Sequence, residues 1–167
     1  MPLVGPVAPH VGNLSFLSVL NLTYTNLTGT IPGEIGRLHR LRYLVLWENS
    51  LSNTIPSALG NLTRLELLLL AANKLSGQIP LDMLFRMHNL RTISLAGNEL
   101  SGQIPPYLFN NTPSLIVIDF GNNSLSGPIP HAITSLSMLE PLSLQLNQLT
   151  GPVPQAIYNM SRLQTIF

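Results

Sequence analysis

The chain has no cysteine and few charged residues. Without cysteine, its 167 residues can form neither a disulfide bond nor a thiolate metal site. Charged residues make up 9% of the sequence, whereas about 25% is typical of a soluble domain. The eight Lys and Arg residues stand singly, and the net charge is +1. The sequence therefore lacks the basic surface with which proteins bind nucleic acid or an anionic membrane.

We expect neither a leader peptide nor a membrane anchor within the sequence as given. The first ten residues contain three prolines and no basic n-region, so they do not match a signal peptide. The longest strongly apolar run, residues 67–72, is far shorter than the roughly 20 residues of a membrane helix. We expect no membrane span in this chain.

The patterns of catalysis and metal binding are missing as well. The sequence has no Ser-His-Asp order, pair of acids or phosphate-binding loop, and none of the V-A-I-K, H-R-D and D-F-G motifs of a kinase. Its four histidines share no metal-ligand spacing and lie outside the predicted strands: His10, His39, His88 and His131. We therefore expect no catalytic residue, no cofactor and no metal ion.

What the sequence does contain is a repeat. Residues 90–105 read L-R-T-I-S-L-A-G-N-E-L-S-G-Q-I-P, the clearest copy of the frame L-x-x-L-x-x-L-x-L-x-x-N-x-L-x-G-x-I-P. Six copies start 24, 24, 25, 25 and 24 residues apart. We expect a single domain, 1–167, made of a partial repeat 1–13, repeats 14–37, 38–61, 62–86, 87–111, 112–135 and 136–159, and a partial repeat 160–167.

Each conserved place in the frame has a physical reason. The alternation at Ile93 and Leu95 predicts a short strand with one buried face, and stacked copies pair these strands into a parallel sheet. Asn98 can tie the backbones of neighbouring coils together through its amide. Gly102 suits a bend with positive φ. The frame predicts an α/β repeat fold, a curved solenoid with a parallel sheet on its concave face and 3₁₀ turns and loops on its convex face.

Two copies depart from the frame. Thr25 replaces the Asn of copy one, so we expect that copy to be less tightly tied to its neighbours. Asn53 replaces the Gly of copy two, and Asn tolerates the left-handed region better than most residues. Copy two is therefore expected to keep its bend.

The segments L-S-G-Q-I-P at residues 75 and 100, L-S-G-P-I-P at 125, and G-N-L-S and G-N-L-T at 12 and 60 resemble the plant-specific leucine-rich repeat. That repeat forms the extracellular domains of plant receptor-like kinases, and the style is similar to the subfamily of the flagellin and elongation-factor-Tu receptors. The resemblance covers residues 3–167. It implies a right-handed solenoid on the outer side of the plasma membrane or in the apoplast, a peptide or protein ligand, and a co-receptor kinase as second partner.

Such ectodomains also carry a signal peptide, a Cys-containing cap, a membrane helix and a kinase, none of which this sequence contains. We therefore expect a fragment of a receptor ectodomain that senses a peptide or protein. Two alternatives stay open. One is an extracellular inhibitor of cell-wall-degrading enzymes, similar to polygalacturonase inhibitors, and the other is a non-functional truncated gene product.

The variable strand positions are the candidate ligand-binding residues. Aromatic and apolar side chains between the buried Leu positions predict one exposed apolar patch on copies two and three, and such patches often mark interfaces. Asp119 could receive a basic group of a ligand. The candidates are Tyr43, Val45, Trp47, Leu67, Leu69, Thr92, Ser94 and Asp119.

Sequons for N-glycosylation are more frequent than chance predicts. They start at Asn13, Asn21, Asn26, Asn61, Asn110, Asn122 and Asn159. Asn21 and Asn122 fall on predicted strand faces in copies one and five. Glycans at these two positions would leave the concave surface of copies two to four open.

Overall fold

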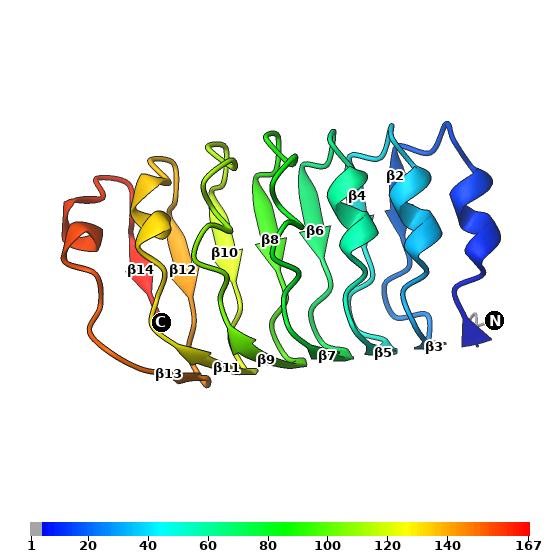
Figure 1. The fold of residues 1–167 in the computed structure, drawn as a ribbon. Coiled ribbons are helices and arrows are strands. Elements are labelled where there is room, and N and C mark those ends of the chain that lie inside the picture. The colour runs from blue at the N-terminus through cyan, green and yellow to red at the C-terminus, as the bar shows by residue number, and fades with distance from the viewer. Residues whose placement is uncertain (1–4) are drawn as a thin grey trace.

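The computed structural model describes residues 5–167 as a right-handed solenoid of stacked coils. The coils lie side by side from the N-terminal to the C-terminal end (Figure 1). Each whole coil contributes one strand to each of two parallel seven-stranded sheets, and the partial coils at the two ends add β1 to one sheet and β14 to the other. Leu3, which continues the repeat frame toward the N-terminus, lies outside the described residues. No helical segment within residues 5–167 has the length and apolar character needed to cross a bilayer.

The first sheet covers the concave face and consists of the L-x-L segments. Its strands are β2 (Val19–Asn21), β4 (Tyr43–Val45), β6 (Leu67–Leu69), β8 (Thr92–Ser94), β10 (Val117–Asp119), β12 (Pro141–Ser143) and β14 (Thr165–Ile166). Successive strands pair in parallel and in register, so equivalent residues of neighbouring coils lie next to each other. The predicted concave sheet is confirmed.

The second sheet runs along one flank and was not predicted. Its strands are β1 (Gly5–Pro6), β3 (Leu27–Gly29), β5 (Ser50–Asn53), β7 (Lys74–Gly77), β9 (Glu99–Gln103), β11 (Ser124–Gly127) and β13 (Gln148–Leu149). These L-S-G segments contain Ser and Gly, which are weak strand formers. They become strands because stacking places the same segment of the next coil at pairing distance.

The convex face carries 3₁₀ helices in the coils of 24 residues. They are η1 (Pro9–Asn13), η2 (Gly33–Arg37), η3 (Ser57–Asn61), η4 (His131–Ser135) and η5 (Gln155–Asn159). The two longer coils have hydrogen-bonded turns instead, at 81–86 and 106–111. Their extra residue lets two adjacent apolar side chains enter the core, Met83 with Leu84 and Leu108 with Phe109, where a 3₁₀ helix buries one, such as Ile35.

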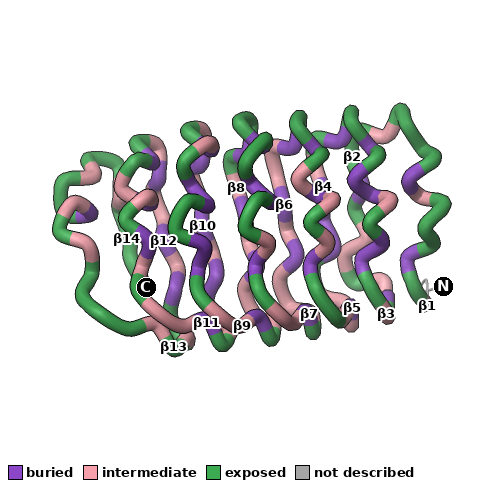
Figure 2. The backbone as a smooth tube through the Cα atoms, viewed as in Figure 1, coloured by how far each residue is buried: buried purple, intermediate pink, exposed green. Residues whose placement is uncertain are grey.

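A single apolar core runs through all the coils, and Figure 2 shows buried segments recurring at the same level of neighbouring coils. Leu44, Leu68 and Ile93 are completely buried. The start of coil one differs, because an equivalent segment stacks on only one side of it in the described part of the chain. Leu14 is therefore 55% exposed, whereas the equivalent Leu38 is 0% exposed.

A ladder of asparagine side chains joins each coil to the one before it. The Nδ2 group of Asn98 donates to the Leu95 carbonyl of its own coil (2.9 Å) and to the Leu70 carbonyl of the preceding coil (3.1 Å). Its Oδ1 accepts a hydrogen bond from the Leu75 N–H (2.9 Å). The same three kinds of bond recur at Asn49, Asn73, Asn123 and Asn147. The predicted role of this Asn is confirmed.

The two irregular copies differ from the others in the groups that make their contacts. The Thr25 hydroxyl lies 2.7 Å from the Leu22 carbonyl oxygen of its own coil and 3.2 Å from Asn49 Oδ1 of the next coil, which also accepts the Thr25 N–H (3.2 Å). That copy one is less tightly tied to its neighbours stays a prediction. Asn53 has a φ of 66°, close to the 76° of Gly102, and coil two keeps the left-handed bend.

A second left-handed position, just before each ladder residue, was not predicted. Its φ lies between 52 and 62° at Tyr24, Glu48, Ala72, Gly97, Asn122 and Leu146. A non-Gly residue in this region costs about 1 kcal/mol. Backbone bonds between coils hold the conformation, as from Ala72 N–H to the Ala96 carbonyl (2.8 Å).

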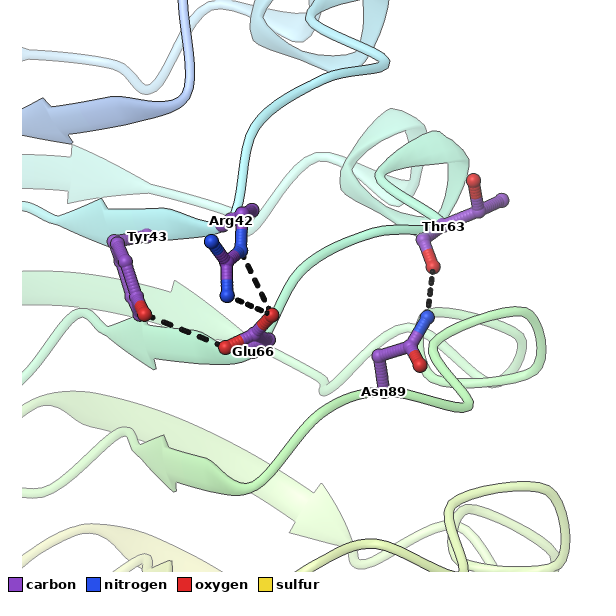
Figure 3. Close-up of polar contacts among 5 residues, drawn as sticks. All are labelled: Arg42, Tyr43, Thr63, Glu66 and Asn89. Carbon is purple, nitrogen blue, oxygen red and sulfur yellow. Dashed lines mark hydrogen bonds and ion pairs between the residues drawn. The ribbon is translucent and has the colours of Figure 1, made fainter.

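We predict that Asn98→Ala lowers the free energy of unfolding by about 3 kcal/mol, because it removes the side-chain bonds to the Leu70 and Leu95 carbonyls and the acceptor of the Leu75 N–H. Asn89→Ala is the matched control. The exposed Asn89 amide makes one bond to a neighbouring coil, to the Thr63 carbonyl (3.2 Å), as Figure 3 shows, and its loss should cost no more than about 0.5 kcal/mol. Urea unfolding followed by circular dichroism measures both. Equal losses in the two variants would contradict the ladder's role.

Candidate functional site

The register of the concave sheet arranges its outward side chains in columns, one residue per coil. The first column lies at the end of each strand and contains Asn21, Val45, Leu69, Ser94, Asp119 and Ser143. The equivalent positions two residues later are Thr23, Trp47, Ala71, Ala96, Gly121 and Gln145. Along the first column the chemistry changes from apolar in coils two and three to polar in coils four to six.

The two columns enclose a shallow hollow of about 270 Å³ that runs from coil two to coil five. Large side chains stand at its ends and small ones form its floor, which leaves the space open. Its lining residues are Trp47, Leu69, Ala71, Ser94 and Asp119. The structure thus brings four of the predicted site residues together, and Ala71 joins them.

The Asp119 carboxylate forms the polar end of this hollow. Its Oδ2 accepts a hydrogen bond from Ser94 (3.2 Å), and its Oδ1 accepts bonds from the Ser143 hydroxyl (2.7 Å) and the Gly121 N–H (3.2 Å). The Ser143 hydroxyl also lies 2.7 Å from Gln145 Oε1, so two oxygens compete for its one proton. Donors from three neighbouring coils therefore orient a half-buried carboxylate that faces the solvent.

Trp47 forms the apolar end of the hollow and is 41% exposed. Its ring packs against Tyr24 of the preceding coil with a centroid distance of 5.5 Å and an angle of 58° between the planes. This tilted arrangement is one that aromatic pairs favour. It continues the apolar end toward coil one.

Glu48 lies beside this aromatic pair. The interaction of the Tyr24 hydroxyl with the Glu48 carboxylate raises the pKa of Tyr24 above its ordinary value, with smaller contributions from desolvation and from the negative charge. Glu48 Oε2 is buried and has no hydrogen-bond partner of good geometry among the described residues.

Polar contacts between coils two and three fix one rim of the concave sheet, as Figure 3 shows. The Arg42 guanidinium donates from Nε to Glu66 Oε1 and forms an ion pair with it (2.8 Å each), and the Tyr43 hydroxyl donates to Oε2 (3.4 Å). The bond to Glu66, together with its charge, raises the pKa of Arg42. The predicted residue Tyr43 is thus half-buried at this rim, with Leu67 and Thr92 next to it in the sheet.

The prediction that Val45 belongs to the exposed apolar patch is wrong, because its side chain is only 8% exposed. The register places it between Asn21 and Leu69, and along its own strand it lies between Tyr43 and Trp47. A small β-branched side chain surrounded by larger ones is covered by them. The exposed patch therefore consists of the neighbours of Val45 and not of Val45 itself.

All seven sequon asparagines are exposed. Asn13, Asn61 and Asn159 are the last residues of η1, η3 and η5, and Asn110 lies in the turn that replaces the helix of coil four. These four belong to alternate coils, so they form one row along the solenoid. Asn21 ends β2, and its Oδ1 accepts hydrogen bonds from the N–H and hydroxyl of Thr23.

The sequence interpretation missed two contributions to the hollow. The pairing of Tyr24 with Trp47 and the bond from Ser143 to Asp119 both join residues of adjacent coils at neighbouring places in the frame. Aligning the six copies in columns would have placed these residues side by side. It would not have given the side-chain rotamers.

Elsewhere in residues 5–167, no group of three or more His, Asp or Glu side chains could hold a metal ion. The four histidines are all exposed. His88 Nδ1 lies 2.8 Å from the Asn111 carbonyl oxygen.

Comparison with known sequences identifies the repeat. A family described as "Leucine rich repeat" matches residues 39–100 and 101–149, which is more than half of the chain. A second one, described as "Leucine Rich Repeat", matches residues 16–38. No curated protein sequence matches the chain at a significant level.

Several solved structures share the fold. The ectodomain of the plant membrane receptor kinase GASSHO1/SCHENGEN3 from Arabidopsis thaliana, in complex with CASPARIAN STRIP INTEGRITY FACTOR 2, has a TM-score of 0.93 and 39% identity over 96% of this chain and 19% of that chain. The plant peptide hormone receptor RGFR1, in complex with RGF2, has a TM-score of 0.91 and 35% identity over 98% of this chain and 26% of that chain. A TDR receptor has a TM-score of 0.93 and 33% identity over 97% of this chain and 28% of that chain. The chain thus spans less than a third of each of these structures.

We predict that the Tyr24 phenol titrates above its ordinary pKa and that Glu48→Gln lowers this pKa, because the substitution removes the carboxylate. The unfolded chain loses the Tyr24 proton at the lower, ordinary pKa. The contact between Tyr24 and Glu48 therefore stabilises the fold fully below the pKa of the unfolded chain. This stabilisation is lost as pH rises through the higher pKa of Tyr24 in the folded protein. The difference between the ultraviolet titration curves of the two proteins measures the shift. Superimposable curves would contradict the contact.

Proposed function

Because the chain belongs to the leucine-rich-repeat family, we propose that it is a ligand-binding module from the extracellular part of a plant receptor-like kinase, with a peptide or protein as ligand. The observation that supports this most strongly is the hollow on the concave sheet, where an exposed Trp47 and an oriented Asp119 carboxylate face the same space. Asp119 lies in β10, and Trp47 follows β4 by two residues and packs against Tyr24. Both groups are thus held in place, and preorganised groups lose little entropy when a ligand binds.

Similar structures support the proposed partners. The GASSHO1/SCHENGEN3 ectodomain is in complex with CASPARIAN STRIP INTEGRITY FACTOR 2, and the plant peptide hormone receptor RGFR1 is in complex with RGF2. The Arabidopsis receptor kinase HAESA is in complex with the peptide hormone IDA and the co-receptor SERK1. For this chain we propose a peptide ligand, a co-receptor kinase as second partner, and a location outside the plasma membrane. Catalysis is not part of the proposed role.

The same comparisons favour this proposal over the enzyme-inhibitor alternative, because the similar structures reported above are receptor proteins. The finer resemblance to the flagellin and elongation-factor-Tu receptors stays a proposal, supported by the L-S-G-x-I-P segments. The division of residues 1–167 into six whole repeats and two partial ones also stays a proposal.

We further propose that the exposed sequons carry N-linked glycans. Four of them form the row on alternate coils, while Asn21 and Asn122 lie near the two ends of the hollow. Glycans at Asn21 and Asn122 would confine a ligand to the surface between them.

We predict that peptide mapping of the chain secreted from plant cells finds glycans at Asn21 and Asn122 as well as along the row. Enzymatic removal of the glycans with a mass shift at each converted Asn gives the occupancy. Unmodified Asn21 and Asn122 in secreted material would contradict the proposed confinement of the ligand.

We predict that Trp47→Ala weakens the binding of peptides selected on the native chain from a phage-displayed library by about 30-fold, because a central Trp of an interface contributes about 2 kcal/mol. Tyr107→Ala is the matched control, since Tyr107 is also a large aromatic residue and is 76% exposed on the convex turn. It should leave the affinity unchanged. Biolayer interferometry measures both. Equal affinities for both variants would contradict binding at the concave face.

A further inference from the structure

We propose that the hollow recognises an extended peptide with an aromatic or large apolar side chain at one position and a Lys or Arg side chain four residues away. This inference rests on the proposed function and adds the chemistry of the ligand. The two ends of the hollow are different, and each selects one class of side chain.

The carboxylate end selects a cation. Asp119 is half-buried, and three donors point its oxygens toward the hollow. All three are neutral groups, and the one ion pair within residues 5–167 joins Arg42 to Glu66 at the rim. Asp119 therefore has a negative charge that no cation of the described chain neutralises. A ligand ammonium or guanidinium group placed here would form a charge-assisted hydrogen bond.

An anionic ligand does not fit the same surface. The hollow is lined by an indole, two aliphatic side chains, one hydroxyl and one carboxylate, so it offers an anion no positive charge. Glu48 beside Trp47 adds a second carboxylate near the apolar end. The arginines that flank the strands do not line the hollow: Arg42 is bound to Glu66, and Arg91 precedes β8.

The indole end selects an apolar or aromatic side chain. Trp47 is 41% exposed, yet Tyr24 and the sheet fix its orientation, so its exposed face is available without reordering. Leu69 and Ala71 extend this apolar surface toward the centre of the hollow. An aromatic ring in contact with Trp47 would gain more free energy than the burial of its area alone provides, because aromatic pairs attract each other in tilted and offset arrangements.

The distance between the two ends sets the spacing in the ligand. Trp47 belongs to coil two and Asp119 to coil five, so three strand intervals of about 4.8 Å, or about 14 Å, separate them across the sheet. The two-residue offset between their columns adds about 7 Å along the strands, which makes the separation about 16 Å in all. A long Lys or Arg side chain covers the remaining few ångströms beyond the backbone spacing. An extended peptide rises about 3.3 Å per residue, and its residues i and i+4 project from the same face about 13 Å apart. The residue between them, i+2, would lie over Ala71 and Ser94, where a small side chain fits. The peptide would cross the strands.

Trp47 is the only tryptophan of the chain, so its fluorescence reports directly on the hollow. The probes are synthetic nine-residue peptides with Leu at i, Gly at i+2 and, at i+4, Lys, norleucine or Glu. A fourth peptide has Lys at i+2 instead. We expect the peptide with Lys at i+4 to shift the Trp47 emission and to bind about tenfold more tightly than the norleucine peptide, which corresponds to one charge-assisted hydrogen bond.

The variant Asp119→Asn keeps the shape of the side chain and removes its charge. We expect it to abolish the preference for Lys over norleucine. Glu99→Gln is the matched control, because Glu99 begins β9 on the flank and is exposed. It should keep the tenfold preference.

The outcomes separate the ligand chemistry from the proposed function. Peptides that shift the Trp47 emission without a preference for Lys at i+4, or with a preference that survives Asp119→Asn, overturn the inference and leave concave binding intact. Equal binding of the peptides with Lys at i+2 and at i+4 overturns the spacing. If neither these peptides nor those selected from the library change the Trp47 emission, both the inference and binding at the concave face are wrong.

Discussion

The side-chain amide of one asparagine per coil is the interaction on which the rest of the structure depends. Asn98 bonds to carbonyls of its own coil and the preceding one and accepts a backbone N–H, so it fixes how one coil sits on the next. The Leu side chains alone would allow neighbouring coils to slide, because hydrophobic burial has no direction. Repetition of this bond keeps the strands in register. Register in turn sets which variable side chains become neighbours.

The candidate site follows from this register. Trp47 and Asp119 are 72 positions apart in the sequence, but three coil intervals bring them to the ends of one hollow. Small residues at the intervening positions, Ala71 and Ser94, make the hollow, since larger side chains there would fill it. The repeat supplies a rigid sheet, and chemistry is added only at positions that its frame leaves free. This division lets one fold present many different surfaces.

Much of the fold could be predicted from the sequence, because one short frame recurs six times. The buried Leu positions, the concave sheet, the role of Asn98 and the bend at Asn53 all follow from local chemistry. The flank sheet could not be predicted in this way, since its Ser and Gly residues gain strand structure only from the next coil. The burial of Val45 and the contact of Tyr24 with Trp47 depend on side-chain packing between coils. The sequence therefore indicated the residues of the site better than their contacts.

The central claim is that peptide ligands bind to the concave sheet between coils two and five. The most direct test is a chemical-shift map, recorded by nuclear magnetic resonance on the isotope-labelled chain while a library-selected peptide is added. The account predicts shifts confined to the backbone amides of β4, β6, β8 and β10 and the Trp47 indole N–H. Shifts that fall instead on the flank sheet or on the convex 3₁₀ helices, with the Trp47 signal unmoved, would contradict it.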